Sequence, residues 1–175
     1  MMSTDSVLHN RMLKYKLFSV SLSYPDEKNF SKLFLEDAFK IEVLHREYDT
    51  LFRAKGISLY AAEYLAENEF QRANYLSDIM GFYNAFGLQT NNERPDAIFI
   101  ELEFMHYLIF KEINAPDKEK VLTCFSAEKK FFNEYIYSPA KEIAKAIISQ
   151  SKNRFYSEIA KSLLDFIEEE KRYYE

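Results

Sequence analysis

Apolar residues recur at steps of three and four positions along most of the chain, and this spacing limits the possible fold more than any other feature. In the first such segment the recurring residues are Leu8, Met12, Tyr15, Phe18 and Leu22. Residues three and four apart share one face of an α-helix, so the spacing predicts an amphipathic helix over residues 5–23. The clean alternation that predicts β-strands is missing, so we expect an all-α fold.

The same periodicity predicts helices over residues 37–54, 69–86 and 152–172. Their expected buried stripes are, in turn, Ile41, Leu44, Tyr48 and Leu51; Phe70, Ala73, Leu76, Met80 and Tyr83; and Phe155, Ile159, Leu163 and Phe166. Gly56 and Gly87 follow the first two segments, where a glycine commonly ends a helix. Residues 55–68 fit no single element.

Proline and aspartate mark the expected starts of the other helices. Pro95 suits the first position of a helix, where a missing N–H costs nothing. The apolar face of that helix would carry Ile98, Leu102, Met105 and Ile109. Asp117 is expected to cap the next helix, and Ser138 with Pro139 to begin another. We predict one bundle-like domain of six or seven helices over residues 1–175.

Charge and cysteine content exclude several classes of protein. The formal net charge is −5 and no cluster of Lys or Arg occurs, so we expect no nucleic-acid binding. No apolar run is long enough to span a bilayer and no signal peptide is evident, which predicts a cytoplasmic protein without stable membrane insertion. The one cysteine, Cys124, is expected to be a small buried apolar residue.

Sequence patterns typical of enzymes are absent. The chain has no Gly-rich phosphate loop and no nucleophile elbow, and no Ser or Cys can be assigned to His9 as a nucleophile. We therefore predict no catalytic residues and no cofactor.

Two Glu-x-x-His pairs leave a metal site open as an alternative. They are Glu42 with His45, and Glu103 with His106. Di-iron bundles use two such pairs plus one Glu from each of two further helices. The predicted first helix has no Glu, and the helix over 69–86 offers only Glu69 and Asp78. Hydrogen-bonded or solvated histidines are thus preferred, with a metal-binding bundle as the alternative.

Residues 93–112, ERPDAIFIELEFMHYLIFKE, are the most unusual segment, with five acidic and two basic side chains. One interpretation is that Asp96 lies in a first helical turn and complements the helix dipole. The other is that Glu93, Asp96, Glu101 and Glu103 form an acidic rim beside aromatic residues, suited to a peptide that carries arginines.

The pattern E-x-P-D followed by E-L-E-F-M-H-Y-L resembles the TorD/DmsD/NarJ family of redox-enzyme maturation chaperones, in particular the branch serving dimethylsulfide-, ethylbenzene- and selenate-type molybdoenzymes. Further pieces follow in the family's order: Leu22-Ser23-Tyr24-Pro25, Tyr48-x-x-Leu51-Phe52, Phe82-Tyr83-x-x-Phe86-Gly87-Leu88 and Phe155-Tyr156-x-x-Ile159-Ala160. The resemblance covers residues 17–169. The chain departs from it at Ala97, where the family often has His, and at residues 135–139, which replace a His-Leu-x-x-Trp segment.

The resemblance implies an all-helical chaperone without enzymatic activity. It would bind the twin-arginine leader or the apo form of a molybdopterin oxidoreductase catalytic subunit during cofactor insertion and before export. The leader's arginines would pair near Glu93, Asp96, Glu101 and Glu103, and Tyr24, Tyr60, Tyr64 and Tyr107 would line its apolar groove; Pro95 and His106 complete the expected client-binding set. The chain would be a monomer or a homodimer. A general helical interaction module without a redox client is the remaining alternative.

Overall fold

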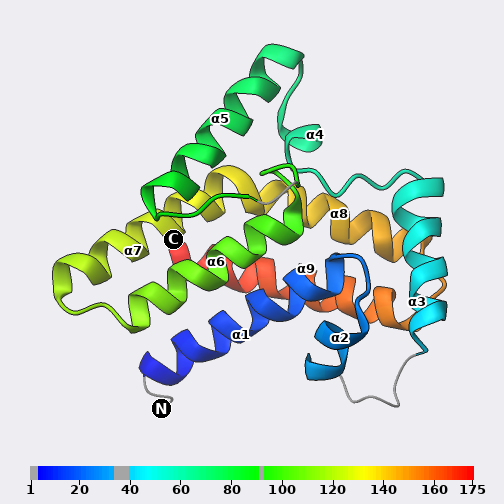
Figure 1. Ribbon diagram of the computed structural model, residues 1–175, viewed down its shortest axis with the longest axis horizontal. Helices are drawn as coiled ribbons and strands as arrows, with labels where there is room; N and C mark the ends of the chain where they lie inside the picture. The colour runs from blue at the N-terminus through cyan, green and yellow to red at the C-terminus, as the bar shows by residue number, and fades with distance from the viewer. Residues whose placement is uncertain (1–3, 34–39, 91–92) are drawn as a thin grey trace.

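The computed structural model describes residues 4–33, 40–90 and 93–175, and these are predominantly helical (Figure 1). The elements are α1 (Thr4–Leu22), α2 (Glu27–Leu33), α3 (Ile41–Tyr48), η1 (Asp49–Ala54), α4 (Ala62–Leu65), α5 (Glu69–Ala85), α6 (Ile98–Ile113), α7 (Lys118–Phe131), η2 (Phe132–Ile136), α8 (Tyr137–Gln150) and α9 (Arg154–Tyr174). The π-helical segments η1 and η2 continue their neighbours, so the described residues form 8 helices and no strand. The all-α prediction is confirmed; the expected count of six or seven omitted the short α2 and α4.

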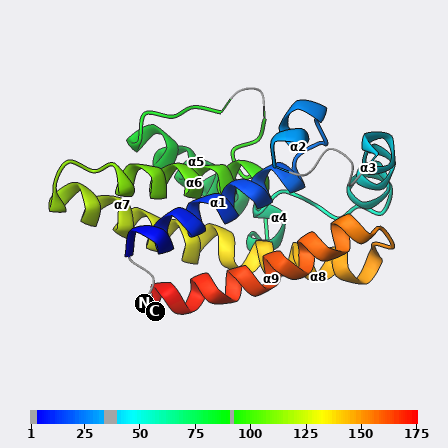
Figure 2. The same ribbon diagram turned by 90° about the horizontal axis from the view of Figure 1, so that it is seen from below.

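The helices pack in pairs around a shared core. α1 lies along α6, α8 lies along α9, and α6 also contacts α7. Figure 2 shows α1 and α6 on one side and the α8–α9 pair on the other, with α3 across one end of that pair. Tyr15, Leu102, Met105, Ile143 and Leu163 are fully buried between these layers. Burial of such side chains is the main favourable contribution to folding.

The apolar stripes predicted for α3, α6 and α9 are buried or nearly so, but of the stripe predicted for α5 only Tyr83 is buried. Phe70 and Met80 are 76% and 48% exposed. The buried residues of α5 are Ile79 and Tyr83. They lie on the face that also carries Phe82, whose ring is 5.2 Å from that of Phe131. Aromatic contacts with the α7–η2 region therefore set the rotation of α5.

Pro139 does not begin a helix, contrary to the sequence prediction. It lies in the first turn of α8, which continues from α7 through η2 without a break. A proline inside a helix removes one backbone hydrogen bond and its ring crowds the preceding turn. The wider turn of η2 comes just before Pro139, and the α7–η2–α8 segment bends there (Figure 1). π-helical turns and prolines are known causes of such bends.

Pro95 lies in a turn before α6, which starts at Ile98 instead of the predicted Pro95. Tyr60 and Ala97 form an isolated antiparallel bridge. The Ile98 N–H donates to the Leu59 carbonyl at 2.7 Å, so the backbone before α6 is occupied by this pairing. Asp117 and Gly87 were predicted correctly: Asp117 caps α7, and Gly87 has a φ of 74° just after α5.

A buried charge network joins the first and last helices. Arg11 of α1 donates to the two carboxylate oxygens of Glu170 at 2.7 and 2.8 Å and to Glu128 of α7 at 3.3 Å. Burial, opposed by Arg11 and reinforced by nearby Glu112, raises the pKa of Glu128 to about 8. The network thus connects α1, α7 and α9 where the start of α1 meets the end of α9.

Candidate functional site

Asp96 is fully buried and acts as an acceptor, not as a first-turn residue of α6. Its carboxylate accepts from Arg94 Nε at 3.0 Å and from Arg94 Nη2 at 2.7 Å. The Ala62 N–H also donates to Asp96, at 3.2 Å. The prediction that Asp96 lies in the first turn and complements the helix dipole is therefore wrong, because the pairing with residues 59–62 delays the start of the helix.

Arg94 is held by two further groups. Its guanidinium lies 4.1 Å from the centroid of the Tyr60 ring, and Nη1 lies 3.5 Å from a carboxylate oxygen of Glu63. The Tyr60 hydroxyl donates to Glu93 at 3.3 Å. The hydrogen bond to Asp96 is the main cause that raises the pKa of Arg94, so the guanidinium stays charged. We call Tyr60, Glu63 and Asp96 the guanidinium site.

An apolar pocket of about 360 Å³ adjoins the same connection between α5 and α6. Its walls are Tyr83, Leu88, Gln89, Thr90, Ile100, Glu103, Phe104 and Tyr107. The Tyr83 hydroxyl donates to the Pro95 carbonyl at 2.8 Å, so Tyr83 connects the pocket with the turn that carries Arg94. Of the residues predicted to bind a client, Glu103 and Tyr107 line this pocket.

The predicted acidic rim is not one surface. Glu101 is fully buried, and among the residues that the structure describes neither of its carboxylate oxygens has a hydrogen-bond partner. Burial, and then the charge of Asp96, raise the pKa of Glu101 well above its usual value, which favours the neutral acid. Glu103 is half-exposed and pairs with Lys16 of α1 at 2.7 Å. Glu93 is partly buried beside Tyr60.

The remaining predicted tyrosines, Tyr24 and Tyr64, are not among the residues that line the apolar pocket. Tyr24 is 44% exposed and contacts Tyr48 edge-on at 5.2 Å. Burial raises the pKa of Tyr48 to about 12, with smaller contributions from nearby Tyr60 and Glu93. The Tyr64 hydroxyl donates to the Ser58 carbonyl at 2.8 Å, which holds residues 58–64 together.

The histidines of the alternative metal hypothesis contact backbone carbonyls in different places. A ring nitrogen of His45 lies 2.8 Å from the Pro25 carbonyl, and one of His106 lies 3.0 Å from the Met12 carbonyl. His106 thereby connects α6 with α1. Within residues 4–33, 40–90 and 93–175, no group of three or more His, Cys, Asp or Glu side chains is arranged to hold a metal ion.

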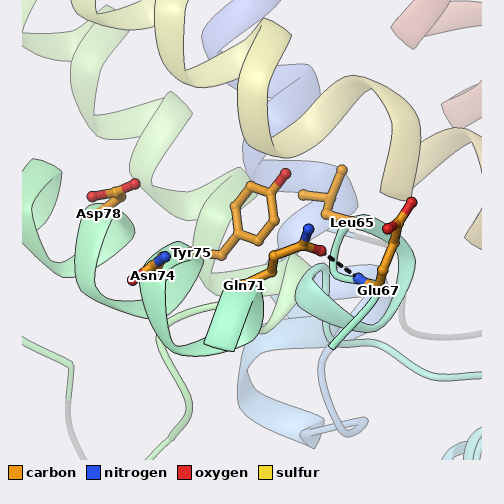
Figure 3. Close-up of a pocket in the computed structure, with 6 residues that line it drawn as sticks. All are labelled: Leu65, Glu67, Gln71, Asn74, Tyr75 and Asp78. Atoms are coloured by element: carbon orange, nitrogen blue, oxygen red, sulfur yellow. Dashed lines mark hydrogen bonds between the residues drawn. The ribbon is translucent and has the colours of Figure 1, made fainter. Parts of the chain in front are cut away.

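A second pocket, of about 500 Å³, lies between α4 and α5 and is mostly polar (Figure 3). Its lining residues are Leu65, Glu67, Gln71, Asn74, Tyr75 and Asp78. The Gln71 side chain accepts from the Glu67 N–H at 2.7 Å. Tyr75 projects from α5 across the pocket, and its ring is 6.2 Å from that of Tyr135. No residue of this pocket was predicted from the sequence to bind a client.

Sequence reasoning missed Arg94, Glu63 and the apolar walls of the first pocket. Arg94 stands at the variable position of the E-x-P-D pattern, and Glu63 lies 31 positions before it. Leu88 directly follows the glycine that ends α5, and Ile100 and Phe104 share one face of α6. The shared face of α6 could be predicted from the sequence. The opposite wall of the pocket comes from residues 83–90, and its position could not.

The amino-acid sequence matches a known protein family over most of its length. Residues 26–141 match the family model described as "Nitrate reductase delta subunit". The chain belongs to this family of NarJ/TorD-type chaperones. A solved structure from Archaeoglobus fulgidus, described as a candidate redox enzyme maturation protein, is similar with a TM-score of 0.57 and 23% identity over 96% of each chain. That likeness shows a shared fold. The chain matches none of the curated proteins with which it was compared.

Family membership confirms the predicted resemblance and supports a chaperone role in molybdoenzyme maturation. The family consists of maturation chaperones, which agrees with a protein that is not a catalyst. Among the described residues, no helix is both long and apolar enough to cross a membrane.

Proposed function

We propose that the chain binds the twin-arginine leader of a molybdopterin oxidoreductase catalytic subunit and holds that subunit until its cofactor is inserted, before export. The observation that carries the proposal is the apolar pocket between the end of α5 and α6, next to the turn of residues 93–97. Leaders of this class combine arginines with an apolar segment. The carboxylates of this region suit the arginines, and the pocket suits the apolar segment.

The pocket is suited to apolar side chains of an extended or helical peptide. Leu88, Ile100 and Phe104 supply apolar walls, and Tyr83 and Tyr107 add rings with a polar end. Such aromatic walls give much contact area at a low cost in side-chain entropy. Glu103 lies at this pocket with its side chain partly exposed, so its carboxylate, which accepts from Lys16 at 2.7 Å, can also accept from a donor of the bound chain.

Only some of the predicted carboxylates are placed where they can meet the leader's arginines. Glu101 is buried and has no route to a client side chain without rearrangement. Glu93, Glu63 and Glu103 are partly exposed, whereas the buried Asp96 carboxylate is paired with the partly exposed Arg94 guanidinium and meets an incoming arginine only if Arg94 moves away. We therefore propose Glu93, Glu103 and the guanidinium site as the groups that meet the arginines.

Titration with a synthetic leader that carries paired arginines and an apolar segment tests the proposal. Leu88→Ala and Tyr107→Ala should each weaken binding by about tenfold, since a lost apolar anchor typically costs more than 1 kcal/mol. Leu122→Ala is the matched control, because Leu122 is 64% exposed on α7 and outside the pocket. Equal affinity for all four proteins would show that the pocket is not the binding site.

A further inference from the structure

Arg94 occupies a site that has every feature needed for an arginine of another chain. Its guanidinium makes paired hydrogen bonds to Asp96 at 3.0 and 2.7 Å, and it lies over the Tyr60 ring at 4.1 Å. Glu63 adds a second carboxylate at 3.5 Å. A carboxylate that matches the planar fork, together with an aromatic face, is how proteins recognise guanidinium groups. The occupant here is the chain's own side chain.

The backbone of the site is held by hydrogen bonds that do not involve the Arg94 side chain. The backbone of the turn is fixed by Ala61 N–H to the Asp96 carbonyl at 2.8 Å and by Ile98 N–H to the Leu59 carbonyl at 2.7 Å. The Asp96 carboxylate is oriented separately by the Ala62 N–H at 3.2 Å. None of these bonds involves the guanidinium. Rotation of the Arg94 side chain, which is 37% exposed, would therefore break its bonds to Asp96 and leave these backbone bonds intact.

The site is also within reach of a chain bound in the apolar pocket. Tyr83 lines that pocket, and its hydroxyl donates to the carbonyl of Pro95, the residue after Arg94. Three carboxylates, Glu63, Glu93 and Asp96, face two cations here, since Arg72 pairs with Glu63 at 3.2 Å beside Arg94, so the local charge favours an incoming cation. One peptide could thus contact both places.

We propose that the guanidinium site receives an arginine of the client leader, and that Arg94 is an internal competitor which the leader must displace. The inference rests on the proposed function. Arg94 is tethered two residues from Asp96, so its effective concentration at the site is high and it lowers the affinity for an arginine from outside. When the leader's arginine displaces Arg94, its pair with Asp96 replaces the Arg94–Asp96 pair. The net gain is small, so the unmodified chain recognises the arginine weakly.

Two peptides and three variants test whether Arg94 competes with the leader's arginine. The probes are a synthetic leader with paired arginines and the same peptide with both arginines replaced by alanine. Arg94→Gln should bind the arginine peptide about tenfold more tightly than the wild type, with unchanged affinity for the alanine peptide. Arg94→Lys should give a smaller gain, because lysine keeps the charge but lacks the fork. Adding Tyr60→Leu to Arg94→Gln should abolish the gain.

Two negative outcomes have different meanings for Arg94 and for leader binding. If neither Arg94 variant binds the arginine peptide more tightly while the wild type binds either peptide, Arg94 only fixes the turn and the inference fails alone. If no protein binds either peptide, both the proposed function and the inference fail. Melting curves show which variants fold, and Arg94→Lys carries the test if Arg94→Gln does not.

Discussion

Asp96 and Glu101 illustrate how two carboxyl groups of one short segment acquire different properties from their surroundings. Asp96 has a guanidinium and a backbone N–H as partners. Glu101 has neither, and it lies fully buried near the negative charge of Asp96. A carboxyl in that position retains its proton, because burial and a like charge both oppose ionisation.

This difference predicts a pH dependence of stability. The unfolded chain releases the Glu101 proton near the usual pKa of 4.5, whereas the folded chain retains it at higher pH. The stabilising contribution is therefore complete below that value and is lost by about 1.4 kcal/mol per pH unit as pH rises toward the raised pKa. Glu101→Gln should remove this slope, measured by urea unfolding between pH 5 and 8. A variant whose stability follows the wild type at every pH would contradict the buried neutral acid.

The site residues were only partly predictable at this scale. Glu103 and Tyr107 were expected at a binding surface and do line the pocket. The covering of Asp96 by Arg94 and the burial of Glu101 were not predictable from the local sequence. Asp96 lies beside the bridge between Tyr60 and Ala97, and Glu101 is buried by packing of α6 against other elements; the sequence pattern gives no signal for either contact between distant positions.

Helix boundaries were predictable where local chemistry decides them. α1, α5 and α9 begin and end within two residues of the predicted limits, because periodicity and caps such as Asn153 act locally. Proline signals were misleading. Pro95 precedes a bridge and Pro139 follows a π-helical turn, so neither marks the first residue of a helix. The face of α5 that is buried depends on rings from another helix.

Attachment of α5 is therefore expected to depend on a few aromatic contacts. Phe82 packs against Phe131 and Tyr135 with ring centroids 5.2 and 5.8 Å apart. Phe82→Ala should lower the free energy of unfolding by about 2 kcal/mol and speed hydrogen exchange in α5. Phe70→Ala, at a position that is 76% exposed on the same helix, should change stability by less than about 0.5 kcal/mol. Equal effects of the two changes on stability would contradict the role of the Phe82 contacts in holding α5.

At the scale of the whole molecule, the Arg11 network connects the first helix to the last. Arg11→Met leaves Glu170 and Glu128 buried without their cation, so it should cost about 3 kcal/mol or more in denaturant unfolding. Lys14→Met is the matched control one turn away. Lys14 pairs with Glu169 at 3.0 Å, but both side chains are well exposed, and the change should cost less than about 1 kcal/mol. Similar losses for both would argue against a structural role for the buried network.

The fold and the family of the chain are shown, whereas the apolar pocket is proposed as the place where the client binds. Photo-crosslinking addresses that place most directly, with a synthetic leader that carries one photoreactive phenylalanine in its apolar segment. We predict that the crosslinks map to residues 83–90 and 100–107, around the apolar pocket, and that Tyr107→Ala reduces them. Crosslinks confined to other helices, at undiminished affinity, would contradict the proposed site.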